Sequence, residues 1–149
     1  YPLRRQRQMC IRDRSYAVAG LVKDYSPEGW PTDHNMVPHG ISVIVNSPAV
    51  FRKTGPACAE RHWKAAAAMG SDLTDTRVED GGDVLAEQIL GMMRETGIPN
   101  GLSGVGYSMD DLDELTDRSY AQKRLIDNGP MPISREDLKE LFSDAMNYW

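Results

Sequence analysis

The sequence predicts an all-α domain, and three observations lead to that prediction. Several segments carry apolar residues at spacings of three and four, and no pair of alternating segments indicates a β-hairpin. Two Ser-x-x-Asp patterns stand where helices would open, and Gly stands where helices would end. The chain has 149 residues, 40% of them hydrophobic, which is enough for one hydrophobic core.

The first elements surround a long loop. Residues 15–23 are small and apolar, and are predicted to end a buried helix. Residues 24–38 hold three Pro and predict a loop, of a length that is usually functional or mobile. The β-branched run 41–45 is compatible with a strand, but Pro38 suits a first helical turn and helices are predicted on both sides. A buried helix is therefore preferred there.

A short helix and then two longer helices are predicted next. Ser47-Pro48 is predicted to break the buried helix and to start a short helix that ends at Phe51. Residues 56–69 begin with Pro, contain four consecutive Ala and stop at Gly70, which predicts a strong helix. Residues 80–96 predict another helix that Gly97 ends. Its apolar face is predicted to carry Leu85, Ile89, Met92 and Met93.

Capping signals place the last helices. Ser108 with Asp111 is predicted to open a helix through about Asp117, and a short helix is predicted over residues 118–126. Ser134 with Asp137 is predicted to open the final helix. The apolar stripe of that helix is Leu138, Leu141, Phe142, Ala145 and Met146.

The charge of the chain is unevenly distributed. Residues 1–14 hold five Arg and one Asp, a net charge of +4, whereas the remainder carries 12 basic and 21 acidic residues, a net charge of −9. An acidic domain is a poor partner for a phosphate backbone, so no nucleic-acid partner is expected. The segment 1–14 lacks a helical or strand period. It is interpreted as non-native sequence, with a genuine basic arm as the alternative, and the domain is taken as 15–149.

Other function classes are excluded by composition. No run of 18 apolar residues predicts a membrane span. The two cysteines, Cys10 and Cys58, cannot form a disulfide framework or a Cys-based zinc site, and a reducing compartment is expected. The acids at 110–117 lack the spacing of a calcium loop and are interpreted as a solvated helix face.

The candidate chemistry rests on three histidines. His34 and His39 flank a Pro at the junction of the long loop and the next helix, in DHNMVPHG. An imidazole at that helix start could offer one ring nitrogen to a divalent metal, but a single His in such a place is more often a hydrogen-bonded capping or core group. His62 lies within ERHWK, where Glu60 and Lys64 are predicted to form an i,i+4 ion pair. His62 is interpreted as a capping or core residue.

The stretch VPHGISVIVNSPAVF resembles the iron-containing alcohol dehydrogenases. The ordered blocks SYAVAGLVKDY, DHNMVPHG, ERHWKAAAAMG, GIPNGLSGVGYS and EDLKELFSDAMNYW are similar to the hydroxyacid–oxoacid transhydrogenase branch of that family. The resemblance covers residues 15–149. It implies the carboxyl-terminal, metal-binding helical bundle of a dehydroquinate synthase-like fold.

The resemblance also implies a metal site. In such enzymes one Asp and three His hold a divalent metal, with Fe²⁺ preferred here and Zn²⁺ the alternative, and an amino-terminal domain binds NAD(P). The last of these His ligands matches His39. The preceding ligand would fall at about position 12, where Arg12 stands, and the other two would lie further upstream. His34 matches the branch pattern and is a candidate for the substrate pocket or for support of the ligands. No catalytic residue is assigned, and this segment supplies no cofactor-binding motif for NAD(P).

The activity implied by the resemblance is hydride transfer from a hydroxy acid such as 4-hydroxybutyrate to a 2-oxo acid such as 2-oxoglutarate. An ordinary iron-containing alcohol dehydrogenase and a non-catalytic helical interaction module are the alternatives. The chain is interpreted as an inactive fragment of a homo-oligomeric, small-molecule enzyme. The enzyme is expected in the cytoplasm, or in the mitochondrial matrix if the source is eukaryotic.

Overall fold

The computed structural model describes residues 9–29, 34–122 and 126–149, with side chains from Ser15 onward. The described part contains helices and no strand, which confirms the predicted all-α class. The α-helices are α2 (Met9–Gly20), α3 (His39–Ile44), α4 (Ser47–Ala68), α5 (Gly81–Glu95), α6 (Leu112–Tyr120) and α8 (Arg135–Asp144). The 3₁₀ turns are η1 (Val78–Asp80), η2 (Ser103–Val105) and η3 (Met109–Asp111).

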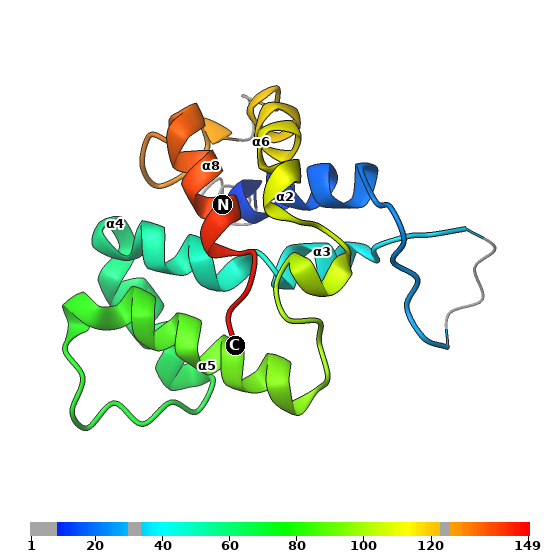
Figure 1. Cartoon of the computed structure of the whole chain (residues 1–149). Helices are drawn as coiled ribbons and strands as arrows, with labels where there is room; N and C mark the ends of the chain where they lie inside the picture. The colour runs from blue at the N-terminus through cyan, green and yellow to red at the C-terminus, as the bar shows by residue number, and fades with distance from the viewer. Residues whose placement is uncertain (1–8, 30–33, 123–125) are drawn as a thin grey trace.

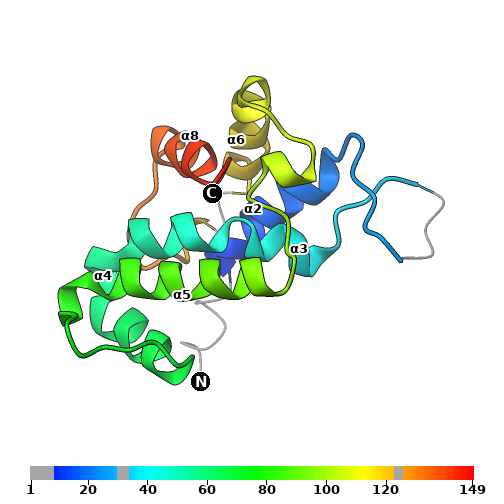
Figure 2. The same cartoon turned by 60° about the horizontal axis from the view of Figure 1, so that its bottom comes forward.

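Helices α4 and α5 form the most extensive helix pair, and both views show them side by side (Figures 1 and 2). Their close approach depends on glycine. A methyl group on Gly82 of α5 would lie 2.6 Å from the Phe51 carbonyl oxygen and 2.7 Å from the Gly55 Cα. The two backbones are therefore nearly in contact, without side chains between them.

The prediction that a helix ends at Phe51 is wrong. Helix α4 continues to Ala68 across a kink at Cys58, whose φ of −138° and ψ of 22° leave the helical region. Pro56 has no N–H to donate to the preceding turn, and this loss bends a helix. Contacts of α4 with α5 and η1 keep the helix from ending there. The predicted stop at Gly70 is confirmed, with a φ of +94°.

Helix α5 confirms the predicted apolar face except at one position. Leu85, Ile89 and Met93 are buried, whereas Met92 is 38% exposed. The buried set also includes Ala86 and Leu90. At about 100° per residue, these additions move the centre of the face so that Met92 lies roughly 90° away from it.

Both predicted capping boxes are present. Ser108 and Asp111 cap the turn that leads into α6, and Ser134 and Asp137 cap α8. The apolar stripe predicted for the last helix is buried in full. The predicted break after Asp117 is wrong, because α6 continues to Tyr120 without a Gly or Pro to interrupt it. Residues 123–125 of the short helix predicted to follow lie outside the described residues.

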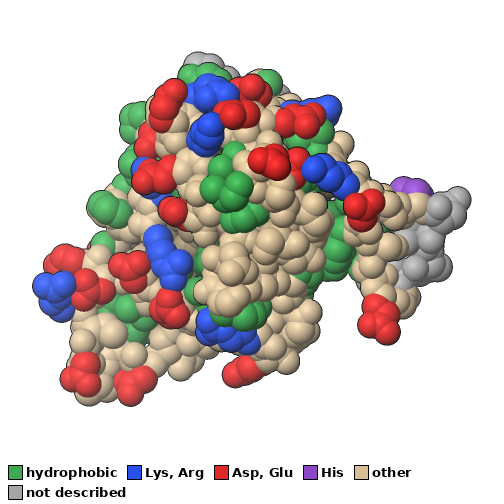
Figure 3. Space-filling model, viewed as in Figure 1, with side chains coloured by type: hydrophobic (Ala, Val, Ile, Leu, Met, Phe, Trp, Pro, Cys, Tyr) green, Lys and Arg blue, Asp and Glu red, His purple; other side chains and the backbone are tan. Residues whose placement is uncertain are grey.

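Ion pairs connect α8 to its neighbours. Lys53 of α4 contacts Asp137 at 2.8 Å and Glu140 at 2.6 Å. Lys139 and Arg135 contact Asp113 and Asp117 of α6, among them Arg135 Nε to Asp117 at 2.7 Å. Figure 3 shows acidic and basic side chains interspersed on this side of the molecule. The acids at 113 and 117 therefore form a paired surface, consistent with the predicted solvated helix face.

The carboxyl-terminal segment returns to the start of α4. The Tyr148 hydroxyl donates to the Val45 carbonyl oxygen at 2.9 Å and accepts from the Ala49 N–H at 3.4 Å. The Asn100 side chain accepts from the Tyr148 N–H at 2.8 Å. These bonds join the segment after α5, the last residues and the α3–α4 junction around one core.

Candidate metal site at the α2–α3 junction

His39 is the first residue of α3, at the end of the long loop. Pro38 precedes the helix with φ −54° and ψ 142°, an extended geometry that proline adopts without strain. Val37 and Pro38 are buried, whereas His39 is exposed. The Ser42 hydroxyl donates to the His39 carbonyl oxygen at 2.8 Å. Buried residues therefore fix the backbone of His39 and leave its ring accessible.

Helix α2 supplies the contacts to the His39 ring. The fully buried Ser15 has its Oγ 3.3 Å from His39 Nδ1. The Tyr16 ring, 54% exposed, lies 6.0 Å from the imidazole ring and is tilted by 35°. No hydrogen bond from Nε2 to a described residue is present. Ser15 therefore holds the Nδ1 side of the ring, and Nε2 lies on the other side of the ring from this contact.

Two long-range contacts hold α2 in place. The buried Tyr107 donates from its hydroxyl to the Val18 carbonyl oxygen at 2.5 Å, and burial raises the pKa of Tyr107. Lys23, just after the helix, contacts the Asp111 carboxylate at 2.5 Å. The Lys23 ammonium lowers the pKa of Asp111, and the Ser108 N–H and hydroxyl act in the same direction. The expectation that all acids at 110–117 are solvated is therefore wrong for Asp111, which is 9% exposed.

The described parts of the long loop, residues 24–29 and 34–38, extend away from the helices between α2 and α3 (Figure 1). They are held by the Met36 N–H, which donates to the Tyr25 carbonyl oxygen at 2.9 Å, and by Asn35, which donates to the Lys23 carbonyl oxygen at 2.6 Å. His34 is exposed on this loop. Its predicted role near the substrate or the ligands stays a prediction.

A metal needs more donors than this junction provides. Zinc and iron sites use three or four protein ligands. Within the described ranges, no three His, Cys, Asp or Glu side chains come together as a metal site would require. The chemistry of His39 fits one ligand position, and the described residues do not complete the set. The position of the preceding predicted ligand, Arg12, lies where side chains are not described.

The third histidine lies away from this junction. His62 is half-buried on the second arm of α4, edge-on to Phe51 of the first arm at 5.2 Å between ring centroids. Its Nδ1 is buried without a hydrogen-bond partner among the described residues. Burial lowers the pKa of His62, because the charged imidazolium is poorly solvated there. His62 therefore packs against Phe51 as a half-buried residue. The predicted Glu60–Lys64 ion pair is present at 2.6 Å.

Acid is expected to destabilise the fold through His62. The folded pKa is depressed, so the unfolded chain binds the proton more readily, and stability falls as the pH drops below about 6.5, the unfolded value. Urea unfolding at pH 7.5 and pH 5.5 measures the difference. The variant His62→Leu is expected to show a smaller difference between the two pH values than the unmodified chain. An unchanged pH dependence in His62→Leu would assign the effect to other groups.

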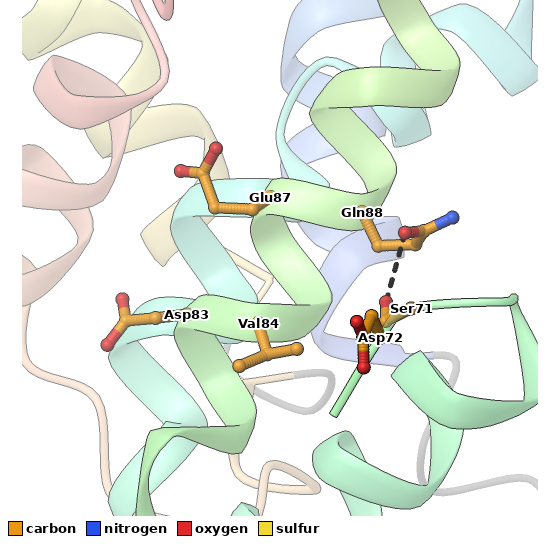
Figure 4. A pocket seen from close by; sticks show the side chains of 6 residues that line it. All are labelled: Ser71, Asp72, Asp83, Val84, Glu87 and Gln88. Carbon is orange, nitrogen blue, oxygen red and sulfur yellow. Dashed lines mark hydrogen bonds between the residues drawn. The ribbon is translucent and has the colours of Figure 1, made fainter. Parts of the chain in front are cut away.

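A surface depression elsewhere in the described structure offers no comparable site. It has a volume of about 390 Å³ and lies between the start of α5 and residues 71–72 (Figure 4). Three carboxylates line it, but Glu87 pairs with Arg52 at 2.5 Å and Asp72 accepts from Thr74. Gln88 accepts from the Ser71 hydroxyl at 3.0 Å. Asp83 lies 3.6 Å from Arg52, so the three carboxylates already have partners among the neighbouring residues.

The model of the Fe-containing alcohol dehydrogenase family, C-terminal, matches residues 33–146. The chain belongs to the iron-containing alcohol dehydrogenase family. This match includes His34, His39 and every helix from α3 onward. It confirms the resemblance inferred from VPHG and the blocks that follow.

Relatives and solved structures agree with this assignment. The chain is 39% identical over 136 residues to a probable hydroxyacid-oxoacid transhydrogenase, mitochondrial, of Dictyostelium discoideum, and 38% identical over 135 residues to the Xenopus laevis and Homo sapiens hydroxyacid-oxoacid transhydrogenases, mitochondrial. Its fold matches a 1,3-propanediol oxidoreductase and an alcohol dehydrogenase from Oenococcus oeni, both with a TM-score of 0.74, at 19% and 18% identity. Each of these alignments spans 91% of this chain and 32% of the solved structure.

The chain spans only part of its relatives. The alignments cover 91% of this chain, but 25% of the Dictyostelium discoideum protein and 29% of the two vertebrate proteins. No helix in the described part is both long enough and apolar enough to cross a membrane.

Proposed function

We propose that this chain is the carboxyl-terminal helical part of a metal-dependent, NAD(P)-linked hydroxyacid-oxoacid transhydrogenase. The observation that carries the proposal is His39, an accessible imidazole held at Nδ1 at the start of α3. It stands in a chain that is 38% to 39% identical to transhydrogenases over nearly all of its length.

His39 Nε2 is the metal ligand that this chain contributes. The described residues offer one ligand, so the remaining donors come from the sequence that precedes the helical domain in the complete enzyme. Divalent iron is the preferred metal and zinc the alternative, because an imidazole binds both. When bound, the metal acts as a Lewis acid on the substrate oxygen.

The chain's own residues orient and shield this position. Pro38 and Val37 fix where the His39 ring emerges, and Ser15 and Tyr16 lie against the ring from α2. We assign His34, on the loop before α3, to the substrate pocket or to support of the metal ligands. NAD(P) belongs to the domain that precedes this one in the family, since the present sequence has no nucleotide-binding motif.

The proposal has consequences for the isolated chain and for the complete enzyme. With one candidate ligand among the described residues and no nucleotide-binding motif in its sequence, the isolated chain is expected to carry out no hydride transfer. The substrates of the complete enzyme are small hydroxy and oxo acids. We place that enzyme in the mitochondrial matrix if its source is eukaryotic, by analogy with relatives named as mitochondrial.

We also infer that residues 1–14 are not native sequence.

Recovery of the complete reading frame tests this proposal. Sequencing the source DNA upstream of the Ser15 codon is expected to reveal a continuous frame with a His near the position of Arg12 and a nucleotide-binding half before it. The complete enzyme, purified with its metal, is then expected to convert 4-hydroxybutyrate and 2-oxoglutarate without added free NAD.

The other outcomes have distinct meanings. Turnover of simple alcohols only with added NAD(P) would identify an ordinary alcohol dehydrogenase. A frame that begins at the Arg-rich segment, in a protein without turnover, would identify a self-standing helical module.

A further inference from the structure

The hydrogen bond between Ser15 and His39 joins two helices across 24 residues of sequence. Ser15 Oγ lies 3.3 Å from His39 Nδ1. Ser15 is fully buried, whereas the ring that it contacts reaches the surface. The buried hydroxyl is therefore a fixed point against which an exposed imidazole is oriented.

The direction of this bond decides what Nε2 can do. If Nδ1 carries the proton and donates to Ser15 Oγ, then Nε2 presents a lone pair to the outside. If the Ser15 hydroxyl donates to Nδ1, then Nε2 carries the proton and cannot bind a cation. The bond thus couples a buried group on α2 to the ligand capacity of an exposed atom on α3.

We propose that Ser15 is a positioning residue that accepts the Nδ1 proton of His39 and thereby holds Nε2 ready to bind the divalent metal. The proposal rests on the metal-ligand role of His39 given above. A neutral imidazole that binds a metal through one nitrogen donates from the other to a fixed acceptor, which sets its tautomer and its ring orientation.

Both ends of the bond are immobilised. On α2, the Tyr107 hydroxyl holds the Val18 carbonyl oxygen, one turn after Ser15. On α3, Ser42 holds the His39 carbonyl oxygen and Pro38 fixes the preceding backbone. The Tyr16 ring against the imidazole restricts rotation further. A ring held in this way keeps its orientation before any metal arrives.

The tautomer of His39 in the metal-free chain provides the direct test. Long-range ¹H–¹⁵N correlation spectra at pH 8 distinguish the two neutral tautomers by the ¹⁵N shifts of the ring. The unmodified chain is expected to show His39 mainly in the Nδ1–H form. A predominantly Nε2–H ring would overturn the proposal, and this measurement needs no variant.

A pair of serine variants assigns the effect. Ser15→Ala is expected to move His39 toward the Nε2–H form. Ser119→Ala is the matched control, because Ser119 is also fully buried and its Oγ has no hydrogen-bond partner in the described part of the chain. Its His39 spectrum is expected to equal that of the unmodified chain. An unchanged tautomer in a folded Ser15→Ala variant would contradict the role of Ser15.

A second readout separates this inference from the proposed function. In the complete enzyme, Ser15→Ala is expected to weaken Zn²⁺ or Fe²⁺ binding by about 10- to 100-fold. If Ser15→Ala changes the tautomer but not the metal affinity, Ser15 sets the tautomer of His39 but does not assist metal binding, and the proposal is refuted. Full metal binding after removal of the His39 imidazole would instead refute the ligand role itself.

Discussion

Replacing Gly82 with alanine is expected to destabilise the chain by about 3 kcal/mol, a large fraction of the free energy of unfolding of an ordinary domain. The added methyl group would lie 2.6 Å from the Phe51 carbonyl oxygen and 2.7 Å from the Gly55 Cα. Both of these are backbone atoms and cannot rotate away, so α4 and α5 must move apart. That movement opens the largest helix contact in the described structure.

Gly91 provides the matched control in the same helix. A methyl group there meets no atom within 4 Å. Gly91→Ala is therefore expected to stabilise α5 by about 0.5–1 kcal/mol through helix propensity alone. Urea unfolding followed by circular dichroism at 222 nm measures both variants. Equal stabilities of Gly82→Ala and Gly91→Ala would show that α4 and α5 are not in close contact.

Replacing His39 with glutamine is expected to remove the metal from the complete enzyme and to lower kcat/KM by at least about 10³-fold. A Lewis acid contributes several kcal/mol to the stabilisation of developing charge, and each 1.36 kcal/mol is tenfold in rate. Metal content per protomer, measured after reconstitution with Fe²⁺ or Zn²⁺, is expected to fall well below one. Activity and metal content should be lost together.

Two further variants make that result specific. Lys64→Ala removes an exposed ion pair with Glu60 and is expected to leave metal content and turnover unchanged. His34→Ala distinguishes the two roles open to His34. A higher KM at full metal content indicates the substrate pocket, and a lower metal affinity indicates support of the ligands. Stoichiometric metal and undiminished turnover in His39→Gln would refute the proposed function.

The capping boxes show what local sequence can determine. Ser108 with Asp111 and Ser134 with Asp137 were predicted from spacing alone, and the structure confirms them. The start of α3 at His39 follows in the same way from Pro38. The hydrogen bonds of these caps join residues within one turn of each other, so the local sequence is enough to predict them.

Helix lengths and faces depended on packing. Pro56 is a local signal to end a helix, yet α4 bends and continues because both of its arms find partners. A periodic pattern gives the angles between side chains, but only the neighbouring helices decide which direction is inward. Met92 therefore ended at the edge of the buried face and not within it.

The sequence by itself determined the helical class, the boundaries set by caps and glycines, the family and the candidate ligand His39. The tertiary structure alone placed Ser15 against the His39 ring and Lys23 against Asp111, which are 24 and 88 residues apart in sequence. No short-range pattern encodes such contacts, because they exist only after hydrophobic burial has brought separate helices together.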